Sequence, residues 1–232
     1  KADNKTRLFG AANPALTYTF SGFVNSESLE ISGVEGMPAL YTSADQDSPA
    51  GGYDILISQG SLTAKNYEFS FTKGMLVIGK GLITITAENK RKTYGDPNPA
   101  LTYTYNGFVN GETLATSGIT GTPVISTEVN QQTGAGEYDI VLSSGTLNAG
   151  NYVIQFIKGK FTVDKAPLTV TAQNKSRLYG QPNPEFTVTY NGFVNNESLA
   201  SSGILGTPEL GTPATATSPA AEYVIKAGNG TL

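Results

Sequence analysis

The chain repeats itself at a constant spacing of 85 residues. The stretch Tyr94–Asn110, which reads YGDPNPALTYTYNGFVN, recurs in related form as Phe9–Asn25 and again as Tyr179–Asn195. A repeat that does not drift indicates that each copy folds into the same unit. Later landmarks keep the same offset: Gly22, Gly107 and Gly192, and Tyr53, Tyr138 and Tyr223.

The repeat divides the 232 residues into three domains, 1–79, 80–164 and 165–232. The first copy has no counterpart of the predicted strand Leu82–Thr86, and the third has no counterpart of Asn151–Asp164. Only the second copy is complete. A sheet edge is therefore expected to be exposed in the third copy, and exposed edges invite pairing with another chain.

Apolar and polar residues alternate within the second copy, which is typical of half-buried strands. Near its end, two such runs flank Lys158-Gly159 and predict a hairpin, and this C-terminal hairpin is what the third copy lacks. The predicted strands centre on Ile83–Ala87, Leu101–Tyr105, Tyr138–Leu142, Tyr152–Phe156 and Phe161–Val163.

The expected fold is all-β, with tandem immunoglobulin-like sandwich units and at most one short helix in each. Gly111–Ser117 could form that helix, with Asn110 as its cap and Gly118 at its end. A β-grasp-like α+β unit is the alternative. The join Lys165-Ala166-Pro167 is short and contains a proline, so successive units are expected to lie end to end as a semi-rigid rod.

Composition removes several classes of function. The chain has no cysteine and no histidine, which excludes disulfides, a thiolate nucleophile, a Ser-His-Asp triad and a histidine metal site. Its net charge of −4 lacks the basic excess of a nucleic-acid binder. No apolar run is long enough to insert into a membrane. The chain is therefore expected not to be an enzyme.

Two recurring motifs could carry chemistry. Gly95, Asn98 and Pro99 are the residue types that a tight turn needs, so turn chemistry is favoured over a ligand loop. Glutamate recurs at one position in each copy, but a glycosidase needs two carboxylates and no second acid recurs. A place near a helix N-terminus explains the glutamate better. These glutamates are Glu27, Glu112 and Glu197.

Other candidates are weaker. Asp45 and Asp47 could bind calcium, as could Glu88 or Asp164 at the joins, but a calcium site wants six to eight oxygens. No cofactor and no metal site are therefore predicted. The run Lys90–Lys92 is interpreted as a solvated face. Tyr103, Tyr105 and Tyr138 could stack on sugars, although their alternation favours the core. The loops 41–50, 126–135 and 211–220 vary most, and a selective ligand would be expected there.

The motifs resemble a known family, the MBG domain of the YGX type. The resemblance rests on Tyr-Gly-x-x-Asn-Pro, Asn-Gly-Phe-Val-Asn-x-Glu, Gly-Thr-Pro and Gly-x-Tyr-Asp-Ile, and on Asn-Tyr-x-Ile-x-Phe-x-Lys-Gly-x-Phe-Thr-Val. It covers nearly the whole chain, although Phe9 replaces the first tyrosine. The resemblance implies an extracellular bacterial cell-surface protein, a tandem-repeat segment of an adhesin, with no established catalytic residues.

The expected function is a non-catalytic stalk or spacer whose partners are the neighbouring repeats. A weak multivalent module that binds glycans or mucin is the alternative, since repeat arrays also present extended binding surfaces.

Overall fold

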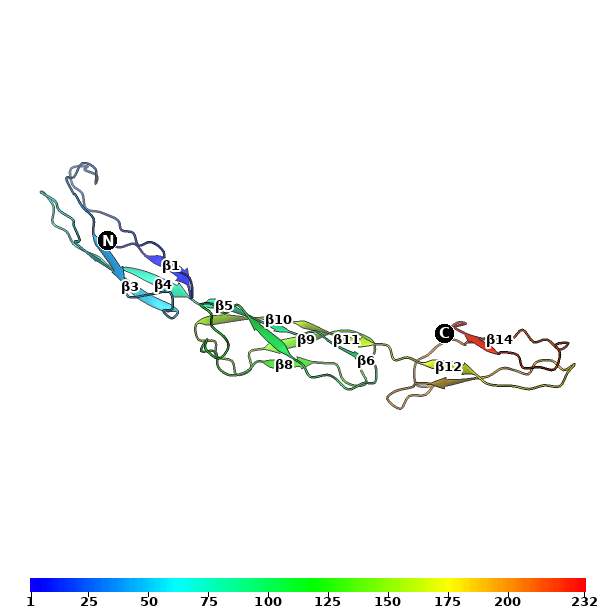
Figure 1. Cartoon of the computed structure of the whole chain (residues 1–232). Coiled ribbons are helices and arrows are strands. Elements are labelled where there is room, and N and C mark those ends of the chain that lie inside the picture. Colours follow the sequence, from blue (N-terminus) through cyan, green and yellow to red (C-terminus); the bar gives the residue numbers. More distant parts are fainter. The chain divides into compact units, whose positions relative to one another are not determined.

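The computed structural model describes all 232 residues, and it consists of strands, turns and loops (Figure 1). The all-β class is confirmed, and the β-grasp alternative, which requires a helix, is wrong. No helix long and apolar enough to cross a membrane is present. The sandwich arrangement within each unit stays a prediction.

The strands follow the repeat. The first copy contains β1 (Lys5–Leu8), β2 (Ala39–Thr42), β3 (Gly51–Ser58) and β4 (Gly74–Gly79). The second contains β5 (Gly81–Ala87), β6 (Lys90–Thr93), β7 (Tyr103–Asn106), β8 (Val124–Thr127), β9 (Gly136–Ser143), β10 (Tyr152–Ile157) and β11 (Gly159–Asp164). The third contains β12 (Thr169–Ala172), β13 (Val188–Asn191), β14 (Glu209–Gly211) and β15 (Lys226–Gly228).

The chain forms two compact units that do not follow the copies. The first comprises Lys1–Glu88, Thr102–Ser126 and Val141–Lys158, and the second comprises Asn89–Leu101, Thr127–Ile140 and Gly159–Leu232. The division falls within the second copy. Each joint between successive copies therefore lies inside one compact unit.

The first unit contains two sheets, with strand orders β1-β4-β3-β2 and β10-β5-β7. Figure 1 shows β1, β3 and β4 side by side. In β5, alternate residues are buried, and Ile83 and Ile85 have no exposed surface. One apolar cluster joins these residues to Leu76 and Ile78 of β4. Residues of the first two copies thus share one core.

The predicted hairpin around Lys158-Gly159 is wrong. β10 pairs in parallel with β5, where Tyr152 lies opposite Gly81, and β11 pairs in parallel with β6, where Phe161 lies opposite Lys90. Both pairs have a register offset of 71 residues. β10 and β11 therefore belong to different sheets and do not pair with each other.

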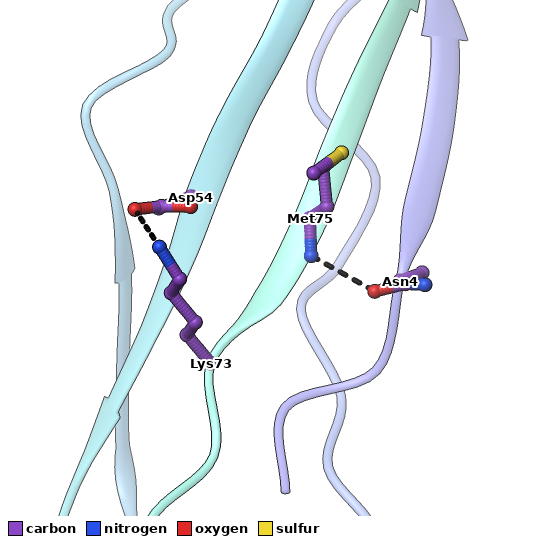
Figure 2. A network of polar contacts seen from close by, with 4 residues as sticks. All are labelled: Asn4, Asp54, Lys73 and Met75. Atoms are coloured by element: carbon purple, nitrogen blue, oxygen red, sulfur yellow. Dashed lines mark hydrogen bonds and ion pairs between the residues drawn. The ribbon is translucent and has the colours of Figure 1, made fainter.

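An asparagine marks the start of the same parallel register in two copies. In the first, the Met75 N–H donates to Asn4 Oδ1 at 2.9 Å, and in the second the Lys160 N–H donates to Asn89 Oδ1 at 2.8 Å. Figure 2 shows Asn4 reaching from the chain before β1 toward β4, with the ion pair between Lys73 and Asp54 nearby at 2.8 Å. Here a side chain takes the place of a backbone ladder partner.

The predicted helix over Gly111–Ser117 is also wrong. Asn110 and Gly111 both have positive φ, at 53° and 70°, and the Glu112 N–H donates to the Val109 carbonyl at 2.9 Å. Two successive positive φ angles closed by such a bond form a type I′ turn, which Asn-Gly favours. A residue with positive φ cannot act as the extended cap of a helix, and a further turn follows.

The third copy contains two pairs of short strands. β12 pairs antiparallel with β13, and β14 pairs antiparallel with β15. In the second copy β5, the strand equivalent to β12, also pairs with β10.

Candidate functional site at the joints between copies

The first joint is built around two aromatic rings. Phe9 of the first copy packs edge-on against Tyr152 of the second, with ring centroids 5.5 Å apart and planes at 85°. Both rings are buried, and Phe108 meets the same tyrosine from another side at 6.2 Å. Edge-to-face pairs of this kind add attraction beyond the area that they bury. The joint is thus part of the core rather than a loose linker.

A glycine allows the two copies to approach. Gly10 has a φ of 81°, and a Cβ on this residue would lie 2.6 Å from the Cβ of Val109. No heavy atom tolerates so short a contact. The position thus requires glycine for two reasons: its φ is positive, and Val109 leaves no room for a side chain.

Polar contacts surround this packing. Gln46 donates from Nε2 to the Gly10 carbonyl at 3.0 Å and to Asn110 Oδ1 at 3.1 Å. Asn110 in turn donates to Asp47 Oδ1 at 2.7 Å, and the Ala50 N–H donates to Asn151 Oδ1 at 3.1 Å. The loop 41–50, where a selective ligand was predicted to bind, therefore forms hydrogen bonds with the second copy.

The second joint uses the same positions. A Cβ on Gly95 would lie 2.6 Å from the Cβ of Val194. Gln131, the counterpart of Gln46, donates to the Gly95 carbonyl at 2.8 Å, and Asn195 donates to the Gln131 carbonyl at 3.2 Å. The repeat thus preserves the contacts between copies as well as the fold within each copy.

The recurring glutamate accepts a hydrogen bond from a tyrosine in every copy. Glu27 accepts from the Tyr67 hydroxyl at 2.6 Å, and Glu112 accepts from the Tyr152 hydroxyl. In the third copy, Glu197 accepts from the hydroxyl of Tyr94 in the preceding copy at 2.6 Å. The predicted place near a helix N-terminus is wrong, since the copies have no helix.

Two of these tyrosines have a raised pKa. Burial raises the pKa of Tyr152, and its bond to Glu112 raises the pKa further. For the more exposed Tyr67, the bond to Glu27 is the main cause of a raised pKa. Both phenols therefore stay protonated as hydrogen-bond donors at neutral pH.

The asparagine of the Asn-Pro turn and a nearby arginine side chain form hydrogen bonds that stabilise the turn. Asn13 and Asn183 donate to the carbonyls of Ala44 and Ala214 at 2.6 and 2.7 Å. Arg7 and Arg177 donate from Nε to these asparagines at 2.7 and 2.8 Å. The asparagine thus bonds within its own copy, but to a carbonyl 31 residues away rather than to its local turn, so it joins the turn to the loop 41–50 in the first copy and to the loop 211–220 in the third.

The interpretation of Lys90–Lys92 as a solvated face is wrong for Lys92. Lys92 is only 7% exposed and donates to the carbonyls of Asp96 and Asn130 at 3.0 and 2.6 Å. Its stem is buried while its ammonium group binds main-chain oxygens. Arg91 is exposed and forms an ion pair with Asp164, which lowers the pKa of that carboxyl group.

The carboxylates proposed for calcium are engaged in hydrogen bonds. Asp45 Oδ1 accepts from the Ser48 hydroxyl at 2.8 Å and from the Asp47 N–H at 3.1 Å, and the serine bond is the main cause of the lowered pKa of Asp45. No group of three or more His, Cys, Asp or Glu side chains could hold a metal ion. The contacts of Asp45 are thus explained by hydrogen bonds within the loop, and calcium at this loop remains only a weak candidate from the sequence.

The aromatic candidates lie within the fold. Tyr103 and Tyr105 pack against the core cluster and meet edge-on at 5.8 Å. Tyr138 is half-buried opposite Phe161 and donates to the Gly134 carbonyl at 2.9 Å. These contacts place all three rings among neighbours of the same chain.

Sequence reasoning missed the joint residues Phe9, Gly10, Tyr152 and Asn110. A signal was available, because tyrosine recurs at 67 and 152 just as glutamate recurs at 27 and 112. Two positions that recur together 40 residues apart are candidates for a contact.

The comparisons with known proteins agree with the motifs. The family described as the MBG domain (YGX type) matches residues 1–77, 83–162 and 168–232. Among curated proteins, none matches this chain. Three matches that together span most of the sequence show that the chain is a tandem-repeat protein and belongs to the MBG domain family of the YGX type.

Proposed function

We propose that this chain is a non-catalytic stalk or spacer segment of a bacterial extracellular surface protein of the adhesin type. The observation that carries the proposal is the pair of matching joints. At each joint a glycine packs against a valine of the next copy, and a glutamine and an asparagine bond across the boundary. A spacer must transmit force and position, which packed joints do and flexible linkers do not.

The partners proposed for each copy are accordingly its neighbours in the chain. Residues of the loops 41–50 and 126–135 bond across the joints, so two of the most variable segments have a structural use. A family membership alone does not assign a ligand, because function belongs to sites rather than to folds.

Small-angle X-ray scattering of the whole chain tests the spacer proposal. We expect the profile of an extended particle whose cross-section is that of one copy, unchanged with and without calcium. A profile of a compact globule, in which the three copies fold back on one another, would contradict a spacer.

A further inference from the structure

Parallel strands pair the early part of a copy with its late part. In the first copy β1 pairs with β4 over four residues, and in the second β5 pairs with β10 over six. Both pairs lie in the first compact unit, and Figure 1 shows β1 beside β4 and β5 beside β10. The direction of these pairs decides how the two copies respond to tension along the chain.

Main-chain bonds extend the ladder of the first copy beyond its strands. Before β1, the Ala2 N–H donates to the Thr72 carbonyl at 2.9 Å. Directly after β1, the Phe9 N–H donates to the Gly79 carbonyl at 2.8 Å. A hydrogen bond therefore closes this ladder at each end, and a load on either strand is passed to the other along its whole length.

One face of both ladders is closed to water. Leu76 and Ile78 of β4 and Ile83 and Ile85 of β5 are buried and belong to one apolar cluster. Competition from water is what makes an exposed hydrogen bond weak. The bonds of these ladders are therefore shielded on their inner side, where the side chains of the cluster lie.

The parallel direction places any tension along the chain at opposite ends of each ladder. Tension pulls an early strand toward its amino end and a late strand toward its carboxyl end. In a parallel pair these two ends lie at opposite ends of the ladder, so the strands must slide past each other and all of their evenly spaced bonds are stretched together. If both loads acted at the same end, the bonds would break one after another at a lower force.

We propose that the ladders β1–β4 and β5–β10 are shear clamps, which we define as parallel strand pairs that hold a copy folded while the chain is stretched. Forced unfolding is governed by the rate of unfolding rather than by equilibrium stability, so a clamp adds a resistance that depends on direction. In the second compact unit, β6 and β11 form a further parallel ladder. The inference goes beyond the spacer proposal and does not rest on it, because the ladders have this direction in any setting.

Optical tweezers on the whole chain test the clamp, with handles attached at pairs of cysteines, since the chain has no cysteine of its own. Lys80→Cys with Lys158→Cys loads β5 and β10 at opposite ends, and Lys80→Cys with Asn148→Cys loads them at the same end; all three positions are exposed. We expect the first variant to unfold at a force several times higher. The length released, about 3.5 Å for each residue between the handles, identifies the event.

The first copy repeats the comparison on its own ladder. Lys1→Cys is combined with Lys80→Cys for opposite ends of β1–β4 and with Thr72→Cys for the same end. Equal urea midpoints of the variants would assign a difference in force to direction alone. Equal forces for the two directions in both ladders, or a lower force for opposite ends, would overturn the clamp. An extended scattering profile would still support the spacer in that case, so the two proposals fail separately.

Discussion

The Tyr152→Ala variant is expected to lose about 3–5 kcal/mol of unfolding free energy, the cost of deleting a large buried aromatic side chain. Tyr152 is only 1% exposed and is shared by two copies, since it packs on Phe9 and Phe108. Its loss also leaves Glu112 without that hydroxyl donor. Urea unfolding followed by circular dichroism measures the change.

Tyr67→Ala is the matched control. Tyr67 makes the same bond to Glu27 and packs on Phe23, with ring centroids 5.8 Å apart, but it is half-buried. We expect roughly half the loss or less, because less apolar area leaves the interior. Tyr152→Phe keeps the ring and should cost only about 1 kcal/mol for the hydroxyl. Equal losses for the two alanine variants would show that the joint adds nothing to the core.

Alanine at the joint glycines is the second large effect. Gly95 has a φ of 92°, so alanine there is strained by about 1–2 kcal/mol. Collision of its Cβ with Val194 adds about 1–3 kcal/mol, the usual cost of overpacking. Gly10→Ala should lower the unfolding free energy by a similar amount, because its Cβ would collide with Val109. The same urea titration measures both.

The third glycine of the series isolates the contact between copies. Gly180 has a φ of 83°, close to that of Gly10, but nothing lies within 4 Å of a Cβ added there. Gly180→Ala should therefore show the backbone strain alone. The difference between Gly95→Ala and Gly180→Ala measures the packing of the joint, and no difference would mean that the copies do not press on one another.

Much of the fold could be predicted from the sequence because its signals are local. Alternation located β5, β9, β10 and β11, and the absence of His and Cys removed whole classes of site. The Asn-Gly pair at 110–111 was also a local signal, and it favours a type I′ turn over the helix that the following residues suggested.

The errors arose where distant pairing overrides local chemistry. Lys158-Gly159 looks like a turn, yet the segments on its two sides pair with different partners, β10 with β5 and β11 with β6. In the first copy the equivalent Gly74 shows why glycine is needed: a Cβ there would lie 2.8 Å from the Ala2 carbonyl oxygen. Close backbone approach is invisible to a reading of neighbouring residues.

The joints were hidden for a related reason. Contacts such as Gln46 with Asn110 connect residues 64 positions apart, and each partner alone is an ordinary polar loop residue. Buried Lys92 likewise looked like a surface charge because its carbonyl partners lie 4 and 38 residues away. Only the repetition of partners at a fixed offset could have shown them.

The central claim is that the copies are joined by packed interfaces rather than linkers. Because the chain has no cysteine, Thr63→Cys in the first copy and Thr122→Cys in the second give two unique, exposed sites for spin labels. The distance distribution between the labels is the most direct test. We expect one narrow distribution, which Gly10→Ala broadens and Gly180→Ala leaves unchanged. A broad distribution in the unaltered joint would contradict the claim.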